Sequence, residues 1–167
     1  MAANTMVLVL GLLMASFTDI QFRKVPNWLT LSLIFLGLVY NTITGPGWFF
    51  SVAGIAAGFI LFYPVYLFAG VGAGDAKLMM AVGSFMGMQN TIIIGILSAV
   101  INAICSVYVS VRQGNLDGLL SYTKSHCIYL FTKANIKDFS KEEVQIQGKG
   151  LPYAVFITLA TIIFMIL

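Results

Sequence analysis

The stretch that decides the fold is LMMAVGSFMGMQNTIIIGILSAVINAICSVYVSV, residues 78–111. It holds 34 residues and no charged side chain. A single straight helix of that length would measure about 51 Å at 1.5 Å per residue, whereas the hydrocarbon core of a bilayer is about 30 Å thick. The stretch therefore predicts two consecutive membrane helices, Ala76–Met88 and Thr91–Val111, with a break near Gly87–Asn90.

The rest of the chain is similarly apolar. Apolar residues make up 59% of the 167 residues, charged residues 9%, and the mean hydropathy is +0.95. A soluble domain carries about a quarter charged residues, so this chain has too few to cover a surface that faces water. We therefore predict an all-α, polytopic membrane protein with about six transmembrane helices rather than a soluble bundle. The six apolar stretches are roughly Ala2–Thr18, Trp28–Ile43, Trp48–Ala69, Ala76–Met88, Thr91–Val111 and Leu151–Leu167.

The basic residues orient these helices. Arg23 and Lys24 follow the first apolar stretch, Lys77 begins the fourth, and the other six of the nine basic residues lie between the fifth and the sixth. The opposite loops and both chain ends carry no ionisable side chain. The positive-inside rule makes the basic face cytoplasmic, so both termini are expected outside. Because the basic pair follows the first apolar stretch, that stretch is expected to be a retained helix and not a cleaved signal peptide.

The chain is expected to form a single membrane-embedded domain over 1–167, with a cytoplasmic polar segment at about 112–150. This segment mixes lysines with aromatic and aliphatic residues. An interfacial amphipathic helix around Leu116–Phe131 and an ordinary polar loop are both compatible with that pattern.

Cysteine and histidine usage argues against a metal centre. Cys105 and Cys127 form no CxxC pair, and His126 is the single histidine, so no HExxH motif exists. Neither a zinc ribbon nor a zinc protease is indicated, and no cofactor is expected.

Two of the six acidic residues stand apart from the polar segment. Asp19 follows the first apolar stretch, and Asp75 follows the glycine-rich turn at the start of the fourth. An ionisable group at membrane depth costs several kcal/mol unless it faces a polar cavity or a partner, which makes it a candidate functional residue. Two neighbouring carboxyl groups can share a proton, one acting as general base on water and the other as acid. The structural alternatives remain open: Asp75 as the N-cap of its helix, and Asp19 as a charge paired with Arg23 or Lys24.

Two sequence signatures carry a resemblance to a known family. Asp19 begins DIQFRKVPN, and Asp75 closes GAGD within VGAGDAKLMMAVG. In this order the two segments resemble the signatures of type IV prepilin peptidases, which belong to the GxGD class of intramembrane aspartyl proteases. The segment Gly150–Leu151–Pro152–Tyr153 before the last helix also resembles a family feature. The resemblance covers the chain from Asp19 onward.

The resemblance implies roles for individual residues. Asp19 and Asp75 would be the catalytic pair. Supporting residues would be Gly72 and Gly74, which allow close backbone approach, Lys77, which orients the site or anchors it at lipid head groups, and Pro26 and Asn27, which set the turn after the first helix.

The implied reaction is removal of the short basic leader from a prepilin or pseudopilin at the cytoplasmic face of the bacterial inner membrane. The chain lacks the paired CxxC motifs of the large bifunctional members, so N-methyltransferase activity is not expected. Its size resembles the small peptidases of tight-adherence (Flp-type) pilus systems, with archaeal preflagellin peptidases as relatives. The expected partners are the substrate helix and membrane lipid, and no nucleic acid.

The alternative function is a small ion- or proton-coupled transporter or channel subunit that uses the same carboxylates. It requires polar groups along a pore, and Ser98, Asn102 and Ser106 are the only candidates on the fifth apolar stretch. Small polar residues in membrane helices more often serve packing.

Overall fold

A computed structural model describes residues 2–69, 73–112 and 152–167, and within these ranges the chain forms helices joined by short turns, with no strand. The described helices are α1 (Ala2–Phe22), α2 (Asn27–Ile43), α3 (Trp48–Ala69), α4 (Ala73–Arg112) and α6 (Tyr153–Ile166). The all-α prediction is therefore confirmed. Gly72 and the polar segment, including 116–131, lie outside the described residues.

Two of these helices are long and apolar enough to cross a bilayer, over Asn4–Phe22 and Ala73–Val109. Three shorter apolar helices accompany them in the described part of the chain, within α2, α3 and α6. The number of six spans and the outside position of both termini stay predictions.

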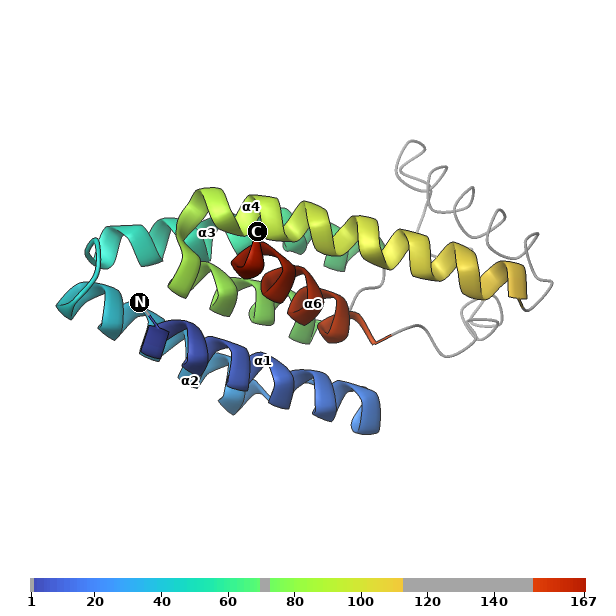
Figure 1. Cartoon of the computed structure of the whole chain (residues 1–167), viewed down its shortest axis with the longest axis horizontal. Helices are drawn as coiled ribbons and strands as arrows, with labels where there is room; N and C mark the ends of the chain where they lie inside the picture. The colour runs from blue at the N-terminus through green and yellow to red at the C-terminus, as the bar shows by residue number, and fades with distance from the viewer. Residues whose placement is uncertain (1, 70–72, 113–151) are drawn as a thin grey trace, which may run out of the picture. The chain divides into compact units, whose positions relative to one another are not determined.

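The contacts divide the chain into two compact units. Unit 1 comprises Met1–Asn102 together with Pro152–Leu167, and unit 2 comprises Ala103–Leu151. In unit 1, α1 packs against both α6 and α2, and α2 packs against α3 (Figure 1). The described part of unit 2 is the last part of α4. The prediction of a single domain is not tested by this division and stays a prediction.

The predicted break in the long apolar stretch is present as a kink at Gly87. Its φ of 76° and ψ of 176° lie outside the helical region and interrupt α4. A positive φ is easily adopted by glycine, which has no Cβ, and a Cβ here would also run into the ring of Phe50. The interruption within Gly87–Asn90 is therefore confirmed, and helical segments flank it on both sides.

The first helix ends later than the sequence predicts. Its helical residues continue to Phe22 instead of ending at Thr18, and Arg23 then takes a φ of 54°. The predicted end followed the loss of hydrophobicity, but polar side chains do not stop a helix while backbone hydrogen bonds can form. The Arg23 N–H still donates to the Asp19 carbonyl at 2.9 Å. Asp19 therefore lies within the last turn of α1 and not beyond its end.

The core of unit 1 follows helical spacing. Leu8, Leu12 and Ala15 form the buried face of α1, and Ala154, Ile157 and Ala160 form that of α6. These positions recur every three or four residues, which places them on one side of each helix. Asp19 falls on the same face of α1, one turn after Ala15, and it is 8% exposed.

Glycines let α3 and α4 approach closely. Gly54 and Gly58 form a small-xxx-small pair on α3, where a Cβ would meet the backbone of Gly83 and Met79 respectively. Membrane helices use such pairs because lipid supplies no hydrophobic force between helices, so close backbone packing must hold them together. This contact fixes the first part of α4, which carries Asp75, against α3.

Candidate functional site

Asp19 is held against the start of α6. Its Oδ2 accepts a hydrogen bond from the backbone N–H of Ala154 at 3.3 Å. The positive charge of Arg23, one turn further along, also acts on this carboxyl group. The structural alternative, in which the charge of Asp19 is paired with Arg23, therefore accounts for one of the interactions of Asp19. It does not account for the contact with α6.

The register of α1 on α6 is set by hydroxyl groups beside Asp19. The Ser16 Oγ lies 2.7 Å from the Thr158 Oγ1 and donates to the Ala154 carbonyl at 3.2 Å. Thr158 in turn donates to the Leu12 carbonyl at 3.2 Å. The peptide groups on both sides of Ala154 are thus bound by α1 side chains, the N–H by Asp19 and the carbonyl by Ser16. These contacts fix the height of the Asp19 carboxyl group relative to α6.

Asp75 lies in the first turn of α4 and is 8% exposed. It is the third residue of the helix, so it lies inside the first turn and not at the N-cap position that the structural alternative assigned to it. The charge of Asp75 acts on the hydroxyl group of Tyr153, the first residue of α6. Consecutive residues at the start of α6 are thus associated with the two aspartates: the Ala154 N–H bonds to Asp19, and the Tyr153 hydroxyl group lies within range of the Asp75 charge. We refer to these four residues as the aspartate cluster.

The two sequence signatures meet in the structure. The Lys77 ammonium group donates to Asn27 Oδ1 at 3.0 Å, which joins the start of α4 to the start of α2. Gly74 lies against Val25, and a Cβ at Gly74 would come to 3.0 Å from the Val25 Cβ. Pro26 precedes α2 with a ψ of 132°, so the extended turn that ends in Asn27 is set locally. Of the predicted supporting residues, Gly74, Lys77, Pro26 and Asn27 are brought together.

Sequence reasoning missed the contribution of α6. Ser16, Thr158 and Ala154 are small residues inside apolar stretches, and nothing in their pattern distinguishes them from packing positions. Tyr153 lies in the segment that the resemblance singled out, but its contacts come from the tertiary structure. Ser98, a candidate for the transporter alternative, donates to the Gly95 carbonyl of its own helix at 2.8 Å and is fully buried.

A second buried polar group of residues lies at the Gly87 end of the first part of α4. Asn41 Nδ2 donates to Ser51 Oγ at 3.0 Å and to the Ser84 carbonyl at 2.8 Å, and Ser51 Oγ donates to that carbonyl at 2.7 Å. All three residues are buried and none is ionisable. We refer to Asn41, Ser51 and Ser84 as the amide cluster.

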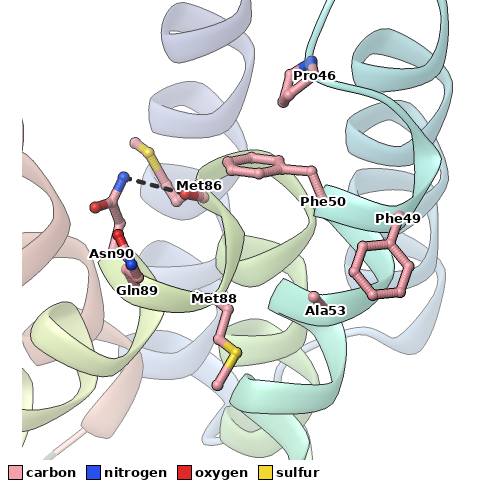
Figure 2. Close-up of a pocket in the computed structure, with 8 residues that line it drawn as sticks. All are labelled: Pro46, Phe49, Phe50, Ala53, Met86, Met88, Gln89 and Asn90. Atoms are coloured by element: carbon pink, nitrogen blue, oxygen red, sulfur yellow. Dashed lines mark hydrogen bonds between the residues drawn. The ribbon is translucent and has the colours of Figure 1, made fainter.

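A pocket of about 470 Å³ lies at the kink in α4, lined by aromatic and methionine side chains and by the amides of Gln89 and Asn90 (Figure 2). It contains no ionisable side chain. Met86, one of its lining residues, is 11 residues from Asp75, or about 16 Å along the helix. The pocket therefore does not contain the aspartate cluster, and acid–base chemistry has no group to act through there. Its lining residues are Pro46, Phe49, Phe50, Ala53, Met86, Met88, Gln89 and Asn90.

Metal ligands do not gather in the described part of the chain, where no group of three His, Cys, Asp or Glu side chains could hold an ion. The chemistry that the described residues support is proton transfer by two carboxyl groups.

Comparison with known proteins places these residues in a family. Residues 6–107 match the family model of type IV leader peptidases. The preflagellin peptidase of Methanocaldococcus jannaschii is 31% identical over 171 residues, which cover 87% of this chain and 73% of that protein. The prepilin leader peptidase/N-methyltransferase of Aeromonas hydrophila is 31% identical over 103 residues, or 55% of this chain and 34% of that protein. The enzyme of the same description from Neisseria gonorrhoeae is 29% identical over 120 residues, 65% and 41% of the two chains. No solved structure matches.

Proposed function

Because the chain belongs to the type IV leader peptidase family, we propose that it is a membrane-embedded aspartyl endopeptidase. Asp19 and Asp75 form its catalytic pair, and its substrates are prepilins or pseudopilins that carry a short basic leader. Cleavage takes place at the cytoplasmic face of the inner membrane. The burial of both aspartates in one helical unit, with Asp19 bonded to the start of α6, is the observation that carries this proposal.

The aspartate cluster suits peptide hydrolysis by acid–base catalysis. One carboxylate removes a proton from a water molecule while the water oxygen attacks the scissile carbonyl carbon. The other carboxyl group donates its proton to the carbonyl oxygen. The tetrahedral intermediate then collapses, the C–N bond breaks, and the leaving nitrogen takes up a proton. Burial of both carboxyl groups favours sharing of one proton, since two close negative charges in a poorly solvated site repel each other.

The substrate class follows from the family and from the charge distribution. The relatives are named for prepilin and preflagellin substrates. A basic leader is attracted by two carboxyl groups, and the nine Lys and Arg residues of the chain lie in segments that the positive-inside rule assigns to the cytoplasm. The leader would remain on this side while the apolar helix of the substrate enters the membrane.

We propose peptidase activity alone, without N-methylation of the new terminus. Within the 167 residues, Cys105 and Cys127 provide no CxxC pair. The chain spans about a third of the length of the bifunctional Aeromonas relative. A methylated product would be heavier than the cleaved one by one CH₂ unit, because the methyl group replaces a hydrogen, so the same mass spectrum decides both questions.

The test is co-expression with a leader-bearing Flp-type prepilin, followed by gel shift and mass spectrometry of the product. Wild type should remove the leader, and Asp19→Asn and Asp75→Asn should each leave it attached while inserting normally into the membrane. Asp117→Asn is the matched control, because it makes the same change at an acidic residue outside both signatures. Normal cleavage by either Asn variant of the pair would show that this aspartate is not catalytic.

A further inference from the structure

The start of α6 takes its cap from another helix. The N–H groups in the first turn of a helix have no partner within it, and a side chain at the N-cap usually accepts one of them. The N-cap residue of α6 is Pro152, whose side chain has no polar atom that could do so. Asp19 takes over this role from α1, because its Oδ2 accepts from the Ala154 N–H at 3.3 Å. The carboxyl group of a proposed catalytic residue thus caps a neighbouring helix.

Two buried hydroxyl groups, of Ser16 and Thr158, hold Ala154 from its other side, and we refer to them as the hydroxyl pair. Ser16 lies one turn before Asp19 on α1, and Thr158 lies one turn after Ala154 on α6. The two hydroxyl oxygens are 2.7 Å apart, and they lie 3.2 and 2.9 Å from the Ala154 carbonyl oxygen. One proton occupies the short contact, so the other can be donated to this carbonyl whichever hydroxyl group donates across the contact. Ala154 is therefore held at its N–H by Asp19 and at its carbonyl by the hydroxyl pair.

The hydroxyl pair also ties α1 to α6. Ser16 bridges the helices through the Ala154 carbonyl, and Thr158 does so through the Leu12 carbonyl at 3.2 Å. A shift of α6 along or around its axis would break these bonds and carry the Ala154 N–H away from Asp19. Hydrogen bonds between membrane helices contribute only about 0.6 kcal/mol on average to stability. A displacement of about 1 Å at a catalytic group can cost about 100-fold in rate, so the same bonds have more effect on geometry than on folding.

We propose that Ser16 and Thr158 are positioning residues of the peptidase, whose hydroxyl groups fix the first turn of α6 so that the Ala154 N–H holds the Asp19 carboxyl group in place. This inference rests on the proposed function for its effect on catalysis. It adds to the site two side chains that neither signature contains. Their role is exerted through the α6 backbone and requires no contact with the substrate.

The first experiment removes both hydroxyl groups and measures cleavage of a purified prepilin substrate. We expect Ser16→Ala/Thr158→Val to lower kcat about 10-fold with little change in KM, because the loss affects the placement of a catalytic group and not substrate binding. Each single substitution should lower kcat less, since the remaining hydroxyl group still bridges the two helices. A double variant with the wild-type kcat would overturn the proposal.

A conservative variant and a matched control separate the hydroxyl group from packing. Thr158→Ser keeps the hydroxyl group and should keep the wild-type kcat, whereas Thr158→Val keeps the shape and should not. Thr161 is also buried in α6, and it donates to the Ile157 carbonyl of its own helix at 2.7 Å, so Thr161→Val should leave kcat unchanged. Equal falls in Thr158→Ser and Thr158→Val, or in the two valine variants, would contradict the proposal.

A spectroscopic measurement keeps the inference independent of cleavage. The amide proton resonance of Ala154, identified in alanine-labelled protein by its absence in Ala154→Gly, should move upfield in Asp19→Ala, which removes the acceptor. It should move in the same direction in Ser16→Ala/Thr158→Val and stay in place in Thr161→Val. An unchanged resonance in the double variant would overturn the inference even if the enzyme is active. Failure of wild type to cleave any leader would count against the proposed function, whereas the resonance would still decide the role of the hydroxyl pair.

Discussion

The aspartate cluster and the amide cluster are both buried in the same helical unit, yet their polar atoms are of different kinds. In the amide cluster, Asn41 donates to Ser51 Oγ, both side chains donate to the Ser84 carbonyl, and no group carries a charge. In the aspartate cluster, two carboxyl groups are buried to the same 8% exposure, and that of Asp19 accepts from the backbone N–H of Ala154 in α6.

This difference helps to distinguish polar groups that are buried for structural reasons from those that are buried for function. A neutral polar group costs little when its hydrogen bonds are satisfied, so the amide cluster can be explained by helix packing. A carboxyl group could be replaced there by an amide of the same shape at a lower desolvation cost. Under the proposed function, the two carboxyl groups are buried at this position because they can exchange protons, which an amide cannot do.

The strongest test of the comparison exchanges carboxyl for amide in the aspartate cluster. Asp19→Asn or Asp75→Asn should lower kcat at least about 100-fold, because an amide cannot take a proton from water. The thermal unfolding midpoint in detergent should stay the same or rise, since a buried ionisable group is removed. A variant that loses activity and stability together would indicate a structural role for that aspartate.

The reverse exchange at the amide cluster should affect stability instead. Asn41→Asp should lower the free energy of unfolding by about 2 kcal/mol or more, because a carboxylate cannot donate to the Ser84 carbonyl and would face it with a negative charge. The folded fraction should cleave at the wild-type rate. Asn90→Asp is the control: Asn90 donates to the Met86 carbonyl at 3.1 Å and is only partly buried, so its loss should be smaller.

The close contact of α3 with α4 gives a further stability prediction. Gly83→Ala should cost about 1–3 kcal/mol, because the added Cβ would meet the Gly54 carbonyl, and backbone on both sides cannot yield without moving the helices. Gly95→Ala makes the same change where the Cβ would meet the end of the Leu61 side chain, which can rotate away. Equal unfolding free energies for the two variants would contradict a tight α3–α4 contact.

Periodicity and charge predicted much of the fold. The apolar stretches correspond to the described helices, and the bilayer-thickness argument placed the break where Gly87 interrupts α4. The predicted end of α1 was one turn too early, because hydropathy reports where apolar residues end and not where backbone hydrogen bonds end. Burial of Asp19 follows from that turn: inside the helix it shares the face of Leu12 and Ala15.

The candidate site was predictable in its ionisable members and not in its neutral ones. Asp19, Asp75 and Lys77 are conspicuous in a chain with 9% charged residues. Ala154 acts through its backbone N–H, which every residue except proline has, so its type carries no information. Tyr153 meets the ring of Phe62 in α3 only through the tertiary packing of α6, and a contact of this kind leaves no local pattern in the sequence.

The smallest expected effect concerns Lys77. The sequence allows two interpretations of this residue, as a charge at the membrane surface or as a residue that orients the site, and variants can separate them. Its bond to Asn27 Oδ1 at 3.0 Å joins the starts of α2 and α4, and its position near water limits the value of the bond to about 1 kcal/mol. Lys77→Met should therefore lower kcat about 3-fold, because the turn that carries Asp75 is less firmly tied to α2.

Lys24→Met removes a second basic charge from the same predicted face of the membrane and serves as the matched control. If Lys77 acts as an anchor alone, the two variants should behave alike in both membrane insertion and cleavage. If it orients the site, Asn27→Ala should reproduce the fall in kcat, and the double variant should fall no further. Such coupling would show that the bond between Lys77 and Asn27 supports catalysis by the aspartate cluster. No bond in the amide cluster is expected to have this role.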